Sequence, residues 1–171
     1  MMHGVPYKAA VVLDREMNAG IVESNERNLR LVSQAWYGAR EDQRSIPPLE
    51  RAADLSKDPE LYVRLAQSQI NLENWKEAAE ALQKGIRLGG LKRSDQANIM
   101  LGMALFNQKR LEQARRAFEN AARDNRSKRA AGQWIAYVDS EIKRRDLMSQ
   151  DLPEYQPRER DDLLDVIEGN N

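Results

Sequence analysis

Residues that commonly perform catalysis are scarce in this 171-residue sequence. The only histidine is His3, near the start of the chain, and there is no cysteine. A Ser-His pair, a histidine metal cluster and a cysteine nucleophile therefore cannot be built. Adjacent carboxylates occur at Asp161 and Asp162, but they lie in an acidic tail with nothing to hold them in a fixed geometry. We expect no catalysis, no metal site and no cofactor.

The stretch GIRLGG, at residues 85–90, has the glycines of a phosphate-binding loop. It follows a helical pattern, so a ligand bound there would meet the negative end of the helix dipole. We interpret Gly89 and Gly90 as the end of a helix.

A basic run in the last third of the chain is accompanied by aromatic residues, a combination that suits single-stranded nucleic acid. It comprises Arg123, Arg126, Lys128 and Arg129, with Trp134 and Tyr137 nearby. The whole chain balances 27 Lys and Arg against 27 Asp and Glu, which argues against an electrostatic nucleic-acid binder. Cations that complement the C-terminal end of a helix are the simpler explanation. RNA binding or regulation through residues 123–129 is kept as the alternative function.

Composition favours a helical protein. Hydrophobic residues make up 41% of the sequence and charged residues 32%, with two phenylalanines, five tyrosines and three tryptophans. This balance favours several solvated helices over a large β core. No stretch approaches the roughly 18 consecutive apolar residues of a membrane span. The opening MMHGVPYKAAVV lacks the pattern of a secretory signal, but a mature or truncated chain would lack one too, so the compartment stays open.

A skeleton of large and small residues recurs three times along the chain. The copies are Leu101-Gly102 with Ala114, Phe118 and Ala121; Leu65-Ala66 with Ala78, Leu82 and Gly85; and Val32-Ser33 with Ser45, Leu49 and Ala52. In each copy 13 residues separate the first apolar position from the later trio (114−101, 78−65, 45−32). The period is 36 residues between the later copies (101−65) and 33 between the earlier ones (65−32). Such self-similarity predicts a repeat architecture.

Each copy predicts two antiparallel helices. The large–small pair lets the second helix approach the first closely, while Phe118 and its counterparts fill the space between them. Asp58-Pro59 marks a helix start. In the first copy, Pro47-Pro48 predicts that the second helix starts late, because proline is tolerated only in a first turn.

This skeleton resembles the tetratricopeptide repeat, whose first helix carries a large–small pair and whose second helix carries A-x3-F and a later alanine. The resemblance covers about residues 26–124 and is strongest over 95–124. It implies an all-α fold, a right-handed α-solenoid of helix-turn-helix repeats. Within residues 23–126 we place three repeats, at about 26–57, 59–92 and 95–126.

The two ends of the chain differ from these repeats. Residues 1–22 are interpreted as a partial repeat, a second helix without its first, which suggests a piece of a longer array. Residues 127–149 show one apolar stripe and predict a C-terminal capping helix. Residues 150–171 carry seven acids and two arginines and are interpreted as an acidic, disordered tail that contains the short amphipathic stretch DDLLDVIEG. Residues 108–150 have a net charge of +5 (11−6) against −5 (2−7) in the tail, which suggests that the tail lies over the last helices.

In tetratricopeptide arrays the first helices line a concave face, and the resemblance places specific residues of this chain there. They are Arg30, Gln34 and Tyr37 in the first copy, Val63, Gln67, Ile70 and Asn71 in the second, and Ile99, Met103, Phe106 and Asn107 in the third. The repeat rule does not demand Met103 or Phe106. They are either adaptable anchors for a peptide or helix, or contacts to the neighbouring repeat.

The resemblance also implies what the groove does not bind. Tetratricopeptide proteins that clamp the C-terminal carboxylates of chaperones present Lys and Asn at these positions. The present chain has Arg30 and Gln34, Val63 and Gln67, and Ile99 and Met103 instead. We therefore do not expect a carboxylate clamp.

The expected function is non-catalytic protein–protein binding, with a peptide or protein partner in the concave groove. We expect no small-molecule substrate, no nucleic acid and no membrane insertion. Parts of the sequence, such as WYGAREDQRSIPPLERAA, are similar to the C-terminal part of bacterial tetratricopeptide proteins associated with TonB-type energy-transduction systems. That similarity implies an accessory role in such a transport system and a periplasmic location; without it the expected location is cytoplasmic.

Overall fold

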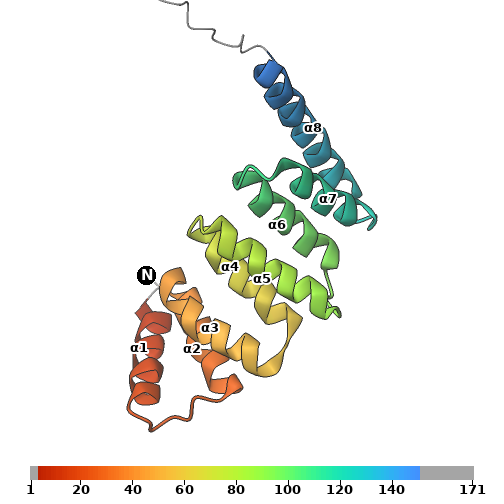
Figure 1. Ribbon diagram of the computed structural model, residues 1–171. Coiled ribbons are helices and arrows are strands. Elements are labelled where there is room, and N and C mark those ends of the chain that lie inside the picture. The colour runs from red at the N-terminus through yellow and green to blue at the C-terminus, as the bar shows by residue number, and fades with distance from the viewer. Residues whose placement is uncertain (1–3, 151–171) are drawn as a thin grey trace, which may run out of the picture.

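The computed structural model describes residues 4–150, with side chains from residue 7 onward, and this range folds into eight helices (Figure 1). The helices are α1 (Gly4–Asn18), α2 (Glu26–Gly38), α3 (Asp42–Ser56), α4 (Pro59–Asn71), α5 (Trp75–Leu88), α6 (Ser94–Asn107), α7 (Leu111–Ala122) and α8 (Lys128–Gln150). The predicted all-α class is confirmed. No helix in this range is long and apolar enough to cross a membrane. The predicted acidic tail, apart from Gln150, lies outside the described residues.

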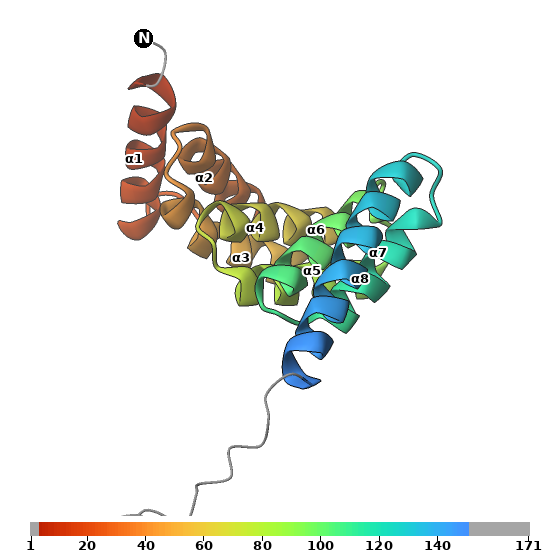
Figure 2. The same ribbon diagram turned by 90° about the horizontal axis from the view of Figure 1, so that it is seen from above.

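The helices form consecutive antiparallel pairs, α2–α3, α4–α5 and α6–α7, and each second helix also contacts the first helix of the next pair. Helix α1 packs on α2, and α8 packs on α7. Seen from above, the row bends, with α2, α4 and α6 toward the inner side (Figure 2). We call the surface formed by α2, α4 and α6 the first-helix face.

The prediction of a late start for α3 is wrong. The helix begins at Asp42, and Pro47 and Pro48 lie inside it. Its first turn is held by Ser45, which is fully buried and whose Oγ donates to the carbonyl of Asp42 at 2.7 Å. The side chains of the two residues four places before the prolines are exposed, so water can reach the carbonyls that lack an N–H donor. In α3, packing of the first turn therefore outweighs the preference of proline for the start of a helix.

The predicted close approach within a helix pair is confirmed at Gly102. A Cβ atom on this residue would lie 2.5 to 2.7 Å from ring atoms of Phe118, which is itself fully buried. The preceding copies place Ala66 with Leu82 and Ser33 with Leu49 at the same positions. Among the three copies, the largest of these second-helix side chains, Phe118, thus lies opposite the smallest of these first-helix residues, Gly102.

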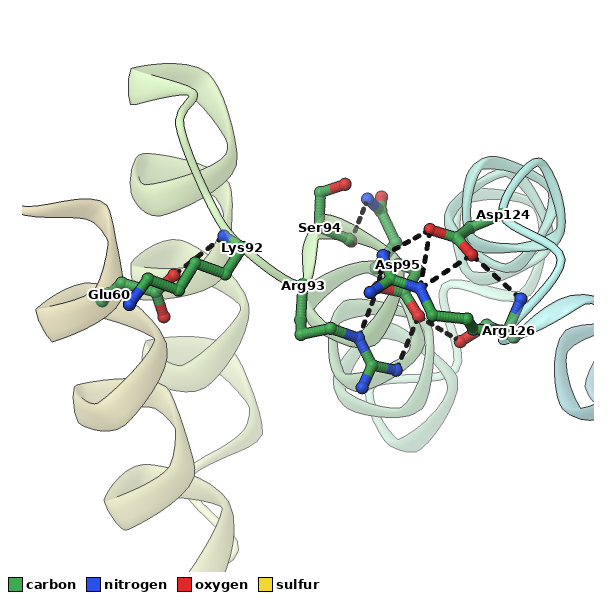
Figure 3. Close-up of polar contacts among 9 residues, drawn as sticks. Glu60, Lys92, Arg93, Ser94, Asp95, Asp124 and Arg126 are labelled. Atoms are coloured by element: carbon green, nitrogen blue, oxygen red, sulfur yellow. Dashed lines mark hydrogen bonds and ion pairs between the residues drawn. The ribbon is translucent and has the colours of Figure 1, made fainter.

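A buried carboxylate joins α6 to the loop between α7 and α8 (Figure 3). Asp95 is 2% exposed and accepts hydrogen bonds from Arg93 Nε at 2.9 Å, Arg93 Nη2 at 2.8 Å and Ser127 Oγ at 2.7 Å. Arg126 Nη2 lies 3.5 Å from the same carboxylate. The hydrogen bonds from Arg93 are the main cause that holds the pKa of Asp95 far below its usual range, against the opposing effect of burial.

The link between α5 and α6 is also fixed to the array. The backbone N–H of Lys92 donates to Oε1 of Glu60, in the first turn of α4, at 2.9 Å (Figure 3). Gly89 and Gly90, which end α5 as predicted, both have positive φ angles, of 75° and 74°, that favour glycine. The longer link is therefore anchored at both ends rather than loosely attached.

We predict that Gly102→Ala lowers the free energy of unfolding by about 1 to 3 kcal/mol, because the added methyl group overpacks the contact with Phe118. The double variant Gly102→Ala/Phe118→Leu recreates the Ala66–Leu82 pair of the previous repeat and should be more stable than the sum of the single changes implies. Urea unfolding followed by circular dichroism measures both effects.

The matched control is Gly132→Ala, on the exposed side of α8, where a Cβ would meet nothing within 4 Å. This change should stabilise the protein by up to about 1 kcal/mol through helix propensity. Equal effects of the two glycine substitutions, or additivity of the Gly102 and Phe118 changes, would contradict the packing explanation.

We predict that Asp95→Asn destabilises the protein at pH 7 by about 1 to 3 kcal/mol, through loss of charge-assisted hydrogen bonds. The folded-state pKa is depressed, so this carboxylate stabilises the fold above its unfolded pKa of about 4, and that contribution is lost as the pH falls. Urea unfolding from pH 7 down to pH 2.5 should therefore show the wild type and the variant converging in acid. Asp124→Asn, which removes the negative charge of a half-buried partner of the exposed Arg126, is the control and should have a smaller effect. A difference that does not change with pH would refute the role of Asp95.

Candidate partner-binding face

The first-helix face contains a partly open pocket of about 240 Å³ between α2 and α4, with one residue of α3 in its wall. It is lined by Arg30, Ser33, Gln34, Tyr37, Gly38, Leu49, Arg64, Gln67 and Ser68. We call this site the α2–α4 pocket. It brings together four of the residues that the sequence placed on the concave face, Arg30, Gln34, Tyr37 and Gln67.

The polar side chains at this pocket are held in different ways. Arg30 contacts Glu26 Oε1 at 3.3 Å and Asp58 Oδ2 at 3.4 Å, so it joins α2 to the start of α4. Gln67 Nε2 donates to Asn71 Oδ1 at 3.1 Å. Arg64 makes no ion pair within residues 4–150, and Tyr37 is 46% exposed. Arg64 and Tyr37 are therefore accessible to a partner.

Small side chains form the deep part of the pocket. Ser33 and Ser68 are buried, at 2% and 1% exposure, and the Oγ atom of Ser68 lies 3.2 Å from that of Ser45. The positions equivalent to Ser68 in α6 and α8 hold Ala104 and Val138, both fully buried. The hydrogen bond with Ser45 therefore compensates the burial of the Ser68 hydroxyl group.

Arg64 lines the pocket but is not among the groove residues that the sequence predicted. Counting along the repeat register, Arg64 corresponds to Met100 in α6 (64+36) and to Trp134 in α8 (100+34). Met100 is 8% exposed, and Trp134 stacks on Phe118 with ring centroids 5.2 Å apart. At the next two junctions this position therefore holds a bulky apolar side chain that packs on the array, whereas Arg64 is exposed and lines the pocket. Counting along the repeat register in the sequence alone would have identified Arg64 as a charged residue at a position that is otherwise bulky and apolar.

The other predicted groove residues lie outside this pocket, and of these Asn71 and Asn107 are exposed. Val63, Ile70, Ile99 and Met103 are half-buried and pack against the main core. Asn71 Nδ2 donates to Asp42 Oδ1 at 3.1 Å, and Asn107 Nδ2 donates to the carbonyl of Met103 at 2.9 Å. The asparagines therefore have partners within the array.

Phe106 packs on the neighbouring helix, the second of the two alternatives that the sequence left open. Its ring centroid lies 6.0 Å from that of Trp134 and 5.3 Å from that of Tyr137, both on α8. Phe106 therefore contributes to the attachment of α8 to the array.

The basic segment 123–129 is partly neutralised by its surroundings. Arg126 Nη2 lies 2.6 Å from Asp124 Oδ2 and 3.5 Å from Asp95 Oδ1 (Figure 3). The hydrogen bond with Asp124 is the main cause that raises the pKa of Arg126. Lys128 and Arg129 begin α8 and are exposed. The four cations are thus not a uniform surface for phosphates.

Comparison with known proteins identifies one repeat directly. The tetratricopeptide-repeat family model matches residues 95–123. No curated protein sequence matches the chain.

Solved structures with a similar fold include a crystal structure of MamA, with a TM-score of 0.69 and 19% identity over 84% of this chain and 82% of that chain. The second tetratricopeptide domain of human RPAP3, in complex with an HSP70 peptide, has a TM-score of 0.56 and 17% identity over 63% and 88%. The first such domain of Spaghetti (RPAP3), bound to an HSP90 peptide, has a TM-score of 0.60 and 16% identity over 71% and 96%. The present chain therefore carries a tetratricopeptide repeat at residues 95–123, within an array that has the fold of tetratricopeptide-repeat proteins.

Proposed function

We propose that the protein is a non-catalytic binding module that takes up a peptide or a segment of a protein on its first-helix face. The observation that carries this proposal is the α2–α4 pocket, a partly open hollow on the first-helix face whose walls come from three helices. A pocket that combines apolar walls with a few polar groups at its rim is the usual form of a specific binding site.

The pocket suits one side chain of a partner. Leu49 and the ring of Tyr37 offer apolar contacts, while Gln34, Gln67 and Arg64 offer hydrogen-bond donors. A buried anchor of this kind supplies most of the energy of an interface, and the surrounding polar contacts set its orientation. We therefore expect a partner segment that crosses α2 and α4 with one side chain in the pocket.

Similar folds that hold peptides support this function. The RPAP3 domains with this fold hold peptides of HSP70 and HSP90. The residues of the present groove, such as Gln34, Val63 and Met103, are not the Lys and Asn that a carboxylate clamp requires. We therefore propose a different peptide sequence as partner.

An accessory role in a TonB-type transport system, with a periplasmic location, stays a prediction from the sequence resemblance. RNA binding through residues 123–129 is the alternative function, and the ion pairs of Arg126 with Asp124 and Asp95 weaken it.

We predict that Arg64→Met weakens the binding of partners while it preserves the fold. Methionine should fill the α2–α4 pocket, because Met100 at the same register position packs on the array, and it removes the charge at the rim. Tyr37→Ala should weaken the same partners, because it removes one wall. Affinity chromatography from a lysate of the source organism, with mass spectrometry and a subsequent titration of each captured partner, measures the loss, which we expect to be at least about tenfold.

Arg87→Met, an exposed arginine in the last turn of α5, is the matched control and should retain every partner. Thermal unfolding of Arg64→Met should show no loss of stability. Partners retained equally by wild type and Arg64→Met would disprove the use of this pocket. Binding that falls steeply with salt and depends on Arg123 and Arg129 would instead support RNA as the ligand.

A further inference from the structure

We propose that the α2–α4 pocket is occupied by residues 161–168 of the same chain, DDLLDVIE, with an apolar side chain inside and carboxylates at the rim. This inference rests on the proposed function, because it assigns an occupant to the same pocket. The segment belongs to residues 151–171, which lie outside the described part of the structure.

The rim of the pocket calls for an anionic partner. The lining includes two arginines and no acidic residue. Within residues 4–150 Arg64 has no ion pair, and Arg30 reaches its two carboxylates only at 3.3 and 3.4 Å. Tyr37 and Gln34 add a phenol and an amide as further donors. Charge-assisted hydrogen bonds to carboxylates are the strong interactions that such a rim can form.

Residues 161–168 have the complementary composition. Four are acidic, four are aliphatic and none is basic. The acidic residues are Asp161, Asp162, Asp165 and Glu168, and the aliphatic ones are Leu163, Leu164, Val166 and Ile167. Each aliphatic residue is therefore within two positions of a carboxylate, so one of them can enter the pocket while its neighbours reach the arginines.

The tether is long enough for the segment to reach the pocket. In the repeat register Arg64 is level with Trp134, and Gln150 lies 16 residues further along α8, about 24 Å at 1.5 Å per residue. Helices α4 and α8 are separated by two steps of about 10 Å each. For parallel helices the straight path would be about 31 Å, and the 13 residues from Gln150 to Leu163 span about 43 Å when extended, which leaves about 12 Å for the bend of the array.

Tethering makes even a weak contact effective. A short flexible linker gives an effective concentration of about 1 mM. A segment that binds with a dissociation constant of about 0.1 mM would then occupy the pocket in about nine tenths of the molecules. A partner would have to displace it, which would make the apparent affinity about tenfold weaker than the intrinsic one.

The basic surface of the last helices, where the sequence charge balance placed the tail, is the competing location. Several of its cations are already paired: Arg115 with Asp139, Arg144 with Glu141, and Arg145 with Glu112 and Asp146. The hollow beside Trp134 and Tyr137 is lined only by residues of α8, so it lacks a second wall to enclose an aliphatic side chain. The α2–α4 pocket has walls from three helices.

The absence of cysteine permits a direct test in the full chain. A nitroxide attached to Asn170→Cys should broaden the backbone amide signals of Gln34 and Gln67 in the ¹⁵N-labelled protein. The broadening should disappear when Leu163, Leu164, Val166 and Ile167 are all changed to serine, which keeps every charge of the segment, and in Arg64→Met, which is designed to fill the pocket. Arg87→Met should leave it unchanged.

Three results would overturn the proposal. The first is no broadening at Gln34 and Gln67, and the second is broadening confined to residues 108–150. The third is broadening that arises only when spin-labelled and ¹⁵N-labelled chains are mixed, because the segment would then come from a second copy. Partner capture is measured separately with Arg64→Met, so the proposed function can stand if the tail binds elsewhere.

Discussion

Close packing between a small residue on one helix and a large residue on the next is the constraint on which the array depends. Each helix pair has one apolar side and can bury it only against its neighbours. The distance between helices is set by residues such as Gly102, whose missing side chain is replaced by the ring of Phe118. Where Ser33 and Ala66 stand instead, the facing residues are leucines. The array therefore keeps its spacing while the side chains that fill it change.

Much of the fold follows from that constraint and could be predicted from the sequence, because the large–small pairs recur at fixed spacing. Proline predicted the start of a helix less well than the spacing predicted the repeats. Pro47 and Pro48 lie inside α3, where packing of the buried Ser45 in the first turn outweighs the preference of proline. The burial of Asp95 could not be predicted, because the residue that links it to the rest of the array, Ser127, lies 32 residues away in a loop. Contacts between distant loops have no periodicity to reveal them.

Part of the candidate site could also be predicted from the sequence, because the repeats have a fixed spacing. Repeat register placed Gln34, Tyr37 and Gln67 on one face, and the structure gathers them around a pocket. The repeat register alone does not say which junction between first helices contains a pocket. The pocket is lined by Arg64, the charged exception at a position where Met100 and Trp134 are bulky and apolar. We infer that specificity in such an array arises where one residue departs from the pattern that builds the fold. Phe106, by contrast, is half-buried and packs against α8.

The central claim is that a partner binds on the first-helix face at the α2–α4 pocket. The most direct measurement is to add a purified captured partner to the ¹⁵N-labelled chain and to map the backbone amide signals that shift. Binding in the pocket predicts the largest shifts on α2 and α4, around Gln34, Tyr37 and Gln67. Shifts confined to residues 123–129, or to the outer helices α3, α5 and α7, would contradict the account.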